Sequence, residues 1–145
     1  MGQILFHLAF PVHSLEATRE FYVDGLGCKM GRTSSIAMTL NFKGHQIIAH
    51  LTETPIPRQD GVYPRHFGLV LKTKSTWQGI VNRAEKKSLL FYQKPRCRFP
   101  HTRLEHLTFF LEDPSGNLLE FKHYRYDSAI LGEAETNQIG DLAPK

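Results

Sequence analysis

The sequence predicts an α+β protein made of tandem βαβββ modules whose strands form a cupped mixed sheet around a cleft. Three observations predict it. The order of strand and helix patterns occurs twice, a segment rich in turn formers separates the copies, and each copy begins with a strand that carries a histidine. Because 145 residues is the length of one domain, we expect a single domain. Its parts are module one at about 4–52, a linker at 53–64, module two at about 65–125 and a polar tail at 126–145.

The elements of module one follow from local patterns. Residues 4–12 are apolar on both faces and rich in strand formers, which predicts a buried strand. Ser14 is a suitable N-cap for a helix over about 14–26, which Gly25 and Gly27 would end. Three strand-like runs follow, at about 28–34, 36–43 and 45–52.

Module two repeats the pattern after the proline-containing linker. A strand at 65–72 precedes a helix at about 75–87, in which apolar residues recur at helical spacing. Three further strands are predicted, at about 89–95, 104–112 and 117–125. The tail from Asp127 to Lys145 has little periodicity, and we expect it to be partly mobile or to form an arm over a partner.

The composition excludes several classes of protein. With 41% hydrophobic and 22% charged residues, the chain is an ordinary globular protein, and no apolar run is long enough to span a membrane. The net charge of +4 is spread over scattered residues, so we expect no nucleic-acid partner. Cys28 and Cys97 lie far apart and form no metal or redox motif, so we expect two reduced packing residues. Without a signal sequence at Met1, a cytoplasmic location is the expectation.

Histidines are the first indication of chemistry. The chain has eight, and the segment His7-Leu8-Ala9-Phe10 recurs as His66-Phe67-Gly68-Leu69 early in the second module. A small residue follows each histidine on the same strand face, which suggests space for a ligand. A single histidine is more often a core or surface residue than a ligand, but two at matched positions favour a metal site.

The last predicted strand of each module carries a further candidate. Glu120 lies among leucine and phenylalanine residues, where an unpaired carboxylate is costly to bury and a metal would compensate it. In module one the candidate is His50, but it follows Gly44 by six positions, whereas Glu120 follows Gly116 by four. His7, His66 and Glu120 would then bind one face of a divalent ion and leave positions open for a substrate.

These features resemble the vicinal oxygen chelate superfamily. The resemblance covers about residues 4–125 and depends on three segments: Phe6–Tyr22 with Leu26-Gly27, Arg65–Gly68, and the ending Glu112–Glu120. The superfamily includes glyoxalase I, bleomycin- and fosfomycin-resistance proteins and extradiol dioxygenases. The resemblance implies metal ligands at His7, His66 and Glu120. His50 lies near the place of a fourth ligand in glyoxalases and of an acid-base histidine in the dioxygenases.

The second half is similar to the extradiol dioxygenase signature. His101, Asp113-Pro114 and Glu120 follow at its spacing, but Phe110 stands where that signature has a tyrosine. The resemblance therefore implies a dioxygenase-like enzyme with Fe²⁺ as the favoured metal over Zn²⁺, Ni²⁺ or Mn²⁺, and with His50 and His101 handling protons. The alternatives are a lactoylglutathione-lyase-like isomerase and a non-catalytic binding protein of the bleomycin-resistance type. It also implies a small-molecule substrate and a homodimer.

Overall fold

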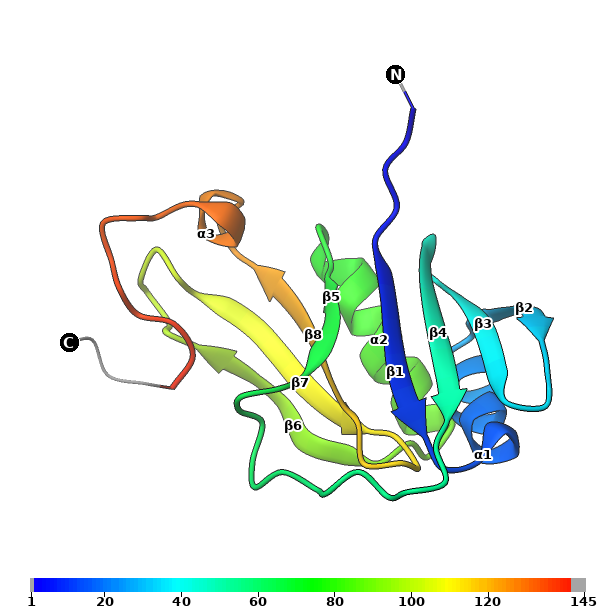
Figure 1. The fold of residues 1–145 in the computed structure, drawn as a ribbon. Helices are drawn as coiled ribbons and strands as arrows, with labels where there is room; N and C mark the ends of the chain where they lie inside the picture. Colours follow the sequence, from blue (N-terminus) through cyan, green and yellow to red (C-terminus); the bar gives the residue numbers. More distant parts are fainter. Residues whose placement is uncertain (1, 142–145) are drawn as a thin grey trace.

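Two four-stranded mixed sheets form the body of the protein, one from each module (Figure 1). The computed structural model describes residues 2–141. The first sheet has the strand order β1-β4-β3-β2 and the second the order β5-β8-β7-β6. The strands of the first sheet are β1 (His7–Val12), β2 (Lys29–Thr33), β3 (Ala37–Phe42) and β4 (His45–Leu51). Those of the second are β5 (Phe67–Val70), β6 (Phe91–Arg98), β7 (His106–Glu112) and β8 (Leu118–Tyr124).

The predicted tandem βαβββ pattern is confirmed. In each module the first strand pairs in parallel with the last, and the intervening strands pair antiparallel. The helix predicted at 14–26 has two parts, α1 (Leu15–Arg19) and the π-helical segment η1 (Glu20–Gly25). The Ser14 hydroxyl accepts a hydrogen bond from the Ala17 amide, as an N-cap does. In module two, Thr73 caps α2 (Lys74–Lys86).

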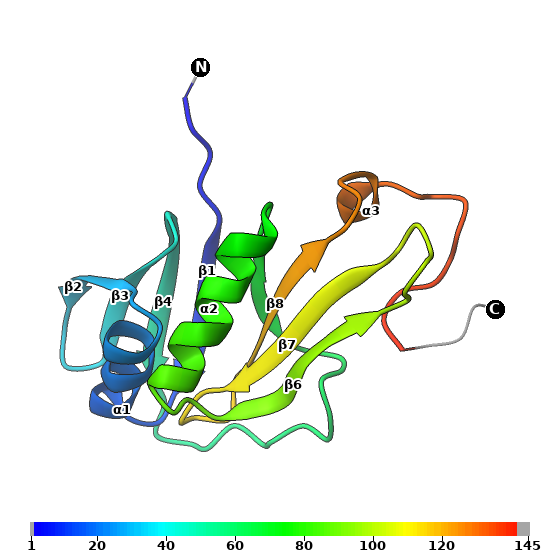
Figure 2. The same ribbon diagram turned by 180° about the vertical axis from the view of Figure 1, so that it is seen from behind.

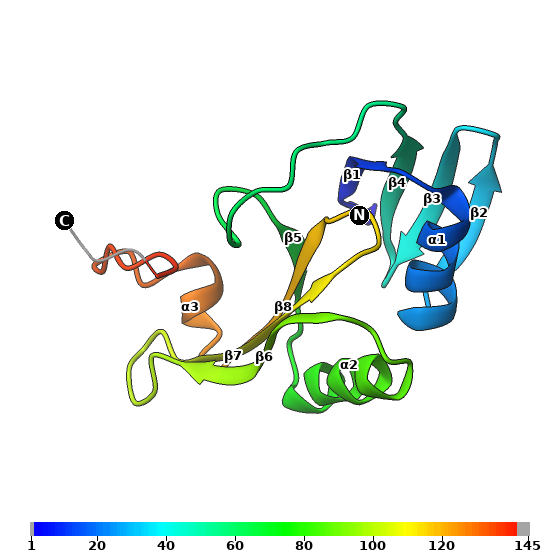
Figure 3. The ribbon, with the colours of Figure 1, turned by 90° about the horizontal axis from the view of Figure 1, so that it is seen from below.

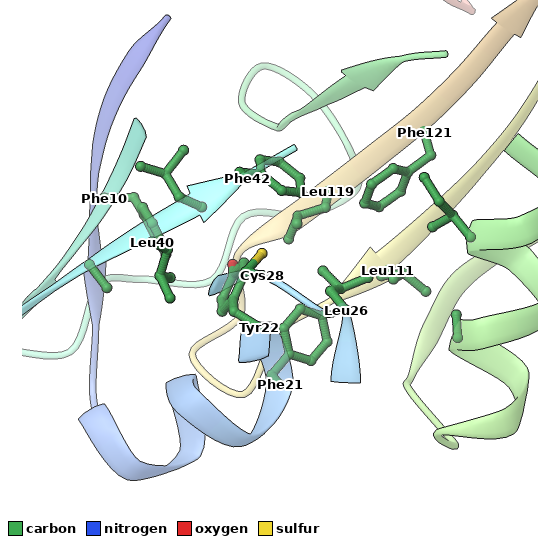
Figure 4. Close-up of a cluster of buried hydrophobic side chains, with 14 of the residues drawn as sticks. Phe10, Phe21, Tyr22, Leu26, Cys28, Leu40, Phe42, Leu111, Leu119 and Phe121 are labelled. Carbon is green, nitrogen blue, oxygen red and sulfur yellow. The ribbon is translucent and has the colours of Figure 1, made fainter. Parts of the chain in front are cut away.

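Helices α1 and α2 lie on one side of the two sheets, which leaves the opposite sheet faces uncovered by them (Figures 2 and 3). Side chains from both modules meet on the helical side in one apolar core (Figure 4). Phe10 of β1 contacts Phe67 of β5 with ring centroids 5.2 Å apart. Cys28 is buried in this core, whereas Cys97 is exposed, so only one of the two cysteines packs as predicted. No helix within the described residues has the length and apolarity needed to cross a membrane.

The turn between β7 and β8 joins the modules through hydrogen bonds. Asp113 is 4% exposed, and its carboxylate accepts bonds from the amides of Ser115 and Asn117 and from the buried Tyr22 hydroxyl of module one. The Asn117 side-chain amide donates to the Pro11 carbonyl of β1 at 2.9 Å. The Asp-Pro-Ser-Gly segment of the predicted signature therefore has a structural role between modules.

Residues 127–141 form an arm that includes the short helix α3 (Ser128–Leu131) and runs along the outer end of the second sheet (Figure 1). The Asp141 carboxylate pairs with the Arg98 guanidinium at the end of β6, and the Asp141 amide donates to the Tyr63 hydroxyl at 2.9 Å. The arm thus covers part of its own chain, whereas the sequence suggested a mobile segment or a contact with a partner. Residues 142–145 of the predicted tail lie outside the described part.

Candidate functional site

His66 and Glu120 lie together on the uncovered face of the second sheet. The His66 Nε2 atom is 3.2 Å from Glu120 Oε1, and the other carboxylate oxygen accepts a hydrogen bond from the Thr108 hydroxyl at 2.6 Å. Lys122 Nζ is 3.6 Å from Oε1. Glu120 is only 6% exposed. Its enclosed carboxylate is compensated by the two basic side chains and by the hydroxyl donor.

The surroundings of His66 and Glu120 shift the pKa of each residue in the direction that favours its charged form. The hydrogen bond to Glu120 raises the pKa of His66 above its usual value, although partial burial acts in the opposite direction. Burial alone would raise the pKa of Glu120, but hydrogen bonds from His66 and Thr108 lower it below its usual value. These shifts favour the imidazolium–carboxylate form of the pair, and Lys122 adds a second positive charge beside the carboxylate.

Both candidate histidines are fixed through the same ring nitrogen. His66 Nδ1 donates to the Val62 carbonyl at 2.7 Å, and His7 Nδ1 lies 2.8 Å from the side-chain oxygen of Gln46. Gln46 is directly opposite His7 in the β1–β4 ladder. Metal-binding histidines commonly have one ring nitrogen held by a protein oxygen in this way, which orients the other toward the ion.

His7 is nevertheless separate from the His66–Glu120 pair within one chain. Strands β1 and β5 run in opposite directions (Figure 1). They contact each other through the rings of Phe10 and Phe67, which serve as the reference point along both strands. His7 precedes Phe10 by three residues and His66 precedes Phe67 by one, so strand geometry separates them by roughly 13 Å along the strands. Accordingly, residues 2–141 contain no group of three histidine, cysteine, aspartate or glutamate side chains that could hold a metal.

Strand register shows which residue of module one corresponds to Glu120. In module two, Gly68 pairs with Glu120, and in module one the matching Ala9 pairs with Ile48. The position equivalent to Glu120 is therefore Ile48, an apolar residue. His50 lies two positions further along β4, opposite Pro11, as the spacing from Gly44 predicted.

Comparison with known proteins gives the family. The model of the Glyoxalase/Bleomycin resistance protein/Dioxygenase superfamily matches residues 4–121, which is most of the chain. The chain belongs to this superfamily. A glyoxalase/bleomycin resistance protein/dioxygenase from Alicyclobacillus acidocaldarius is 40% identical, with a TM-score of 0.83, over 88% of this chain and 96% of that one.

Two more distant solved structures share the fold. The fosfomycin resistance protein FosX from Listeria monocytogenes is 16% identical with a TM-score of 0.67, over 89% of this chain and 99% of that one. FosX from Mesorhizobium loti is 15% identical with a TM-score of 0.64, over 90% and 99% of the respective chains. No curated protein sequence matches the chain significantly.

The two histidines that the family resemblance predicted as acid-base residues lie apart from the His66–Glu120 pair. His50 is exposed beside a shallow hollow that Pro11 and Thr52 also line. His101 is exposed in the turn after β6, where its amide donates to Glu105. Their proton-transfer roles remain predictions.

A residue that we did not predict, His106, lies inside the site region instead. It is 5% exposed on β7, on the same strand face as Thr108, and lines a cavity with His66 and Glu120. Strand alternation from Thr108 is the one sequence signal that would have found it. Because His66 also borders a second cavity of about 370 Å³ beside β1, it lies between two spaces that could receive a small molecule.

Gly68, two residues after His66, is explained by the packing of two strands. A Cβ atom at Gly68 would lie 1.7 Å from the carbonyl oxygen of Glu120. The absence of a side chain therefore allows the close approach of β5 and β8, and the interpretation of Gly68 as space for a ligand is replaced by this packing requirement.

Proposed function

We propose that this protein is a metal-dependent enzyme of the dioxygenase type that acts on a small organic molecule. The metal would be held by His7, His66 and Glu120. Two imidazoles and one carboxylate with no fourth protein ligand is the donor set of many non-haem Fe(II) oxygenases, so Fe²⁺ is the favoured ion over Zn²⁺, Ni²⁺ or Mn²⁺. The apolar Ile48 at the position equivalent to Glu120 supports this choice over a lyase with four protein ligands.

The observation that carries the proposal is the way the three side chains are held. The Val62 carbonyl fixes the tautomer of His66, Gln46 orients His7, and the Thr108 hydroxyl holds one oxygen of Glu120. A bound divalent ion would supply a Lewis acid and open positions for substrate and O₂. Lys122 adds a positive charge that favours an anionic substrate.

We further infer that the metal site forms between two copies of the chain. His7 is distant from its own His66, so a two-fold homodimer in which β1 of one copy meets β5 and β8 of the other would give two complete sites. Each site would then take His7 from one protomer and His66 and Glu120 from its partner.

The test is elemental analysis of protein purified without chelators, followed by activity assays. We expect about one divalent ion per chain and its loss in Glu120→Gln. Oxygen consumption with a panel of catechols and other vicinal diols would support the dioxygenase type. Turnover of a hemithioacetal without oxygen consumption would establish the lyase type instead, and an absence of metal in freshly purified protein would contradict both.

A further inference from the structure

The arm roofs a cavity next to the His66–Glu120 pair. The cavity is about 470 Å³, its floor is the uncovered face of β6, β7 and β8, and residues 129–140 of the arm contribute to its wall. This volume suits a small organic molecule. The superfamily model matches residues 4–121, so these arm residues lie outside the matched region.

Arg98 is the enclosed cation of this cavity. Its side chain is only 11% exposed, and its charge is compensated by the Asp141 carboxylate from the arm. An enclosed guanidinium requires an anion, and the arm supplies one. Without Asp141, no carboxylate of the cavity would be paired with Arg98, because Glu120 is paired with His66 and Lys122 and the arm residue Glu133 with Arg103. The unpaired guanidinium favours an anionic ligand.

His106 is the second polar group of the floor. Its Nδ1 atom lies 2.9 Å from the Leu104 carbonyl, which only accepts, so the proton is on Nδ1 and Nε2 is an acceptor. Nε2 is enclosed and has no hydrogen-bond partner among residues 2–141. Burial lowers the pKa of His106, which keeps the ring neutral. An unpartnered acceptor is costly, and a ligand hydroxyl would satisfy it.

The register of the sheet places these two groups side by side. Arg98 is directly opposite His106 in the β6–β7 ladder, so their side chains are cross-strand neighbours. Aromatic residues surround them: Phe99, Phe110, Tyr63 and Tyr124 all line the cavity. A ligand that contacts both would carry an anion and a hydroxyl on adjacent atoms of a flat apolar body.

We propose that this cavity binds a small aromatic carboxylate with a neighbouring hydroxyl group, whose carboxylate replaces that of Asp141 on Arg98 and whose hydroxyl donates to His106 Nε2. As an identification of the substrate class, this inference rests on the proposed function. As a statement about the cavity, it requires no metal and is tested without one.

The experiment is calorimetric titration of the metal-free full-length chain with salicylate, and with benzoate and phenol as comparators. Salicylate should bind most tightly, benzoate about fivefold more weakly because it lacks the hydroxyl, and phenol more weakly still. Arg98→Gln should weaken salicylate binding at least tenfold. Asp141→Asn should tighten it severalfold, because the competing carboxylate is removed. The control Arg96→Gln changes an exposed arginine of the same strand outside the cavity and should have no effect.

Tighter binding by Asp141→Asn is the decisive result, since a purely structural role of the arm would weaken binding. Equal affinity of the Arg98→Gln and unaltered proteins for salicylate, or no tightening in Asp141→Asn, would overturn the inference. If Arg98→Gln fails to fold, the Asp141→Asn comparison decides alone. Metal uptake without salicylate binding would refute only this inference, whereas salicylate binding without metal uptake would refute only the proposed metal site.

Discussion

The three candidate ligands are each held by an uncharged oxygen that belongs to another residue. Gln46, the Val62 carbonyl and Thr108 provide these oxygens, and none of them changes charge with pH near neutrality. The orientation of His7, His66 and Glu120 is therefore maintained whether His66 carries a proton or not. The surroundings are organised before any ion binds.

The protonation of His66 gives a prediction for the metal-free protein. Because the hydrogen bond to Glu120 raises the pKa of His66, the pair stabilises the fold fully below the unfolded-state pKa of histidine, and the contribution is lost as the pH rises through the folded-state pKa. Glu120→Gln should therefore lower the free energy of unfolding by about 2 kcal/mol at pH 6 and by clearly less at pH 9. Urea denaturation in the presence of a chelator measures both values.

A matched control uses a carboxylate whose partner does not titrate. Glu112 is paired with Arg58 at 2.7 Å, so the effect of Glu112→Gln should be the same at pH 6 and pH 9. A loss in Glu120→Gln that is equally large at both pH values would show that the pair does not depend on the imidazolium.

At the scale of elements, the contact between β5 and β8 positions the pair. Gly68→Ala would place a methyl group against the backbone of Glu120, and backbone cannot move aside as a flexible side chain can. We expect the free energy of unfolding to fall by about 3 kcal/mol. Metal uptake should fall with it, because β8 carries Glu120. Thermal denaturation and elemental analysis of the same samples check this expectation.

Gly79 offers the corresponding control for a glycine-to-alanine change. It lies in α2 with no atom within 4 Å of the position that a Cβ would take, so Gly79→Ala should stabilise the protein by about 1 kcal/mol. Similar effects of the two substitutions would mean that the close approach at Gly68 is tolerated, and the packing explanation would be wrong.

Elements with a clear apolar period could be predicted from the sequence, whereas elements that depend on tertiary partners could not. The strands and α2 were found because their patterns are strong. Strand β1 begins at His7 rather than at residue 4, and Ile4 is 91% exposed. The sequence suggested a mobile tail or an arm over a partner, and it did not show the packing of the arm on its own chain, because contacts such as Asp141 with Arg98 join residues distant in sequence.

The candidate site was predictable only in part for the same reason. Duplication of the histidine motif and the isolated carboxylate identified His66 and Glu120, which do lie together. His106 was missed because Thr108, from which strand alternation leads to His106, was itself not identified as a site residue. Its position beside Arg98 follows from the β6–β7 register, which a single sequence does not specify.

At the scale of the whole molecule, a site shared between two protomers predicts complementation. His7→Ala and Glu120→Ala should each be inactive and free of metal. After the two variants are mixed and allowed to exchange subunits, half of the dimers would be mixed, and each would contain one complete site, so about a quarter of the unaltered metal content should return. Elemental analysis after removal of loose metal measures it.

The pair His66→Ala and Glu120→Ala is the control, since both changes affect the same half of the site and every mixed dimer remains incomplete. No recovery in the first mixture, or a monomeric mass at micromolar concentration, would rule out the shared site. Recovery in both mixtures would indicate a ligand set other than the proposed one.

The hydrogen bonds of the β7–β8 turn have a consequence for how the molecule folds. Tyr22 and the Pro11 carbonyl belong to module one, yet their partners Asp113 and Asn117 belong to module two. Separated from each other, the halves would each expose polar groups and part of a common core to solvent. Because neither module has a complete core or a complete set of hydrogen bonds without the other, we expect the two modules to unfold together in a single cooperative transition.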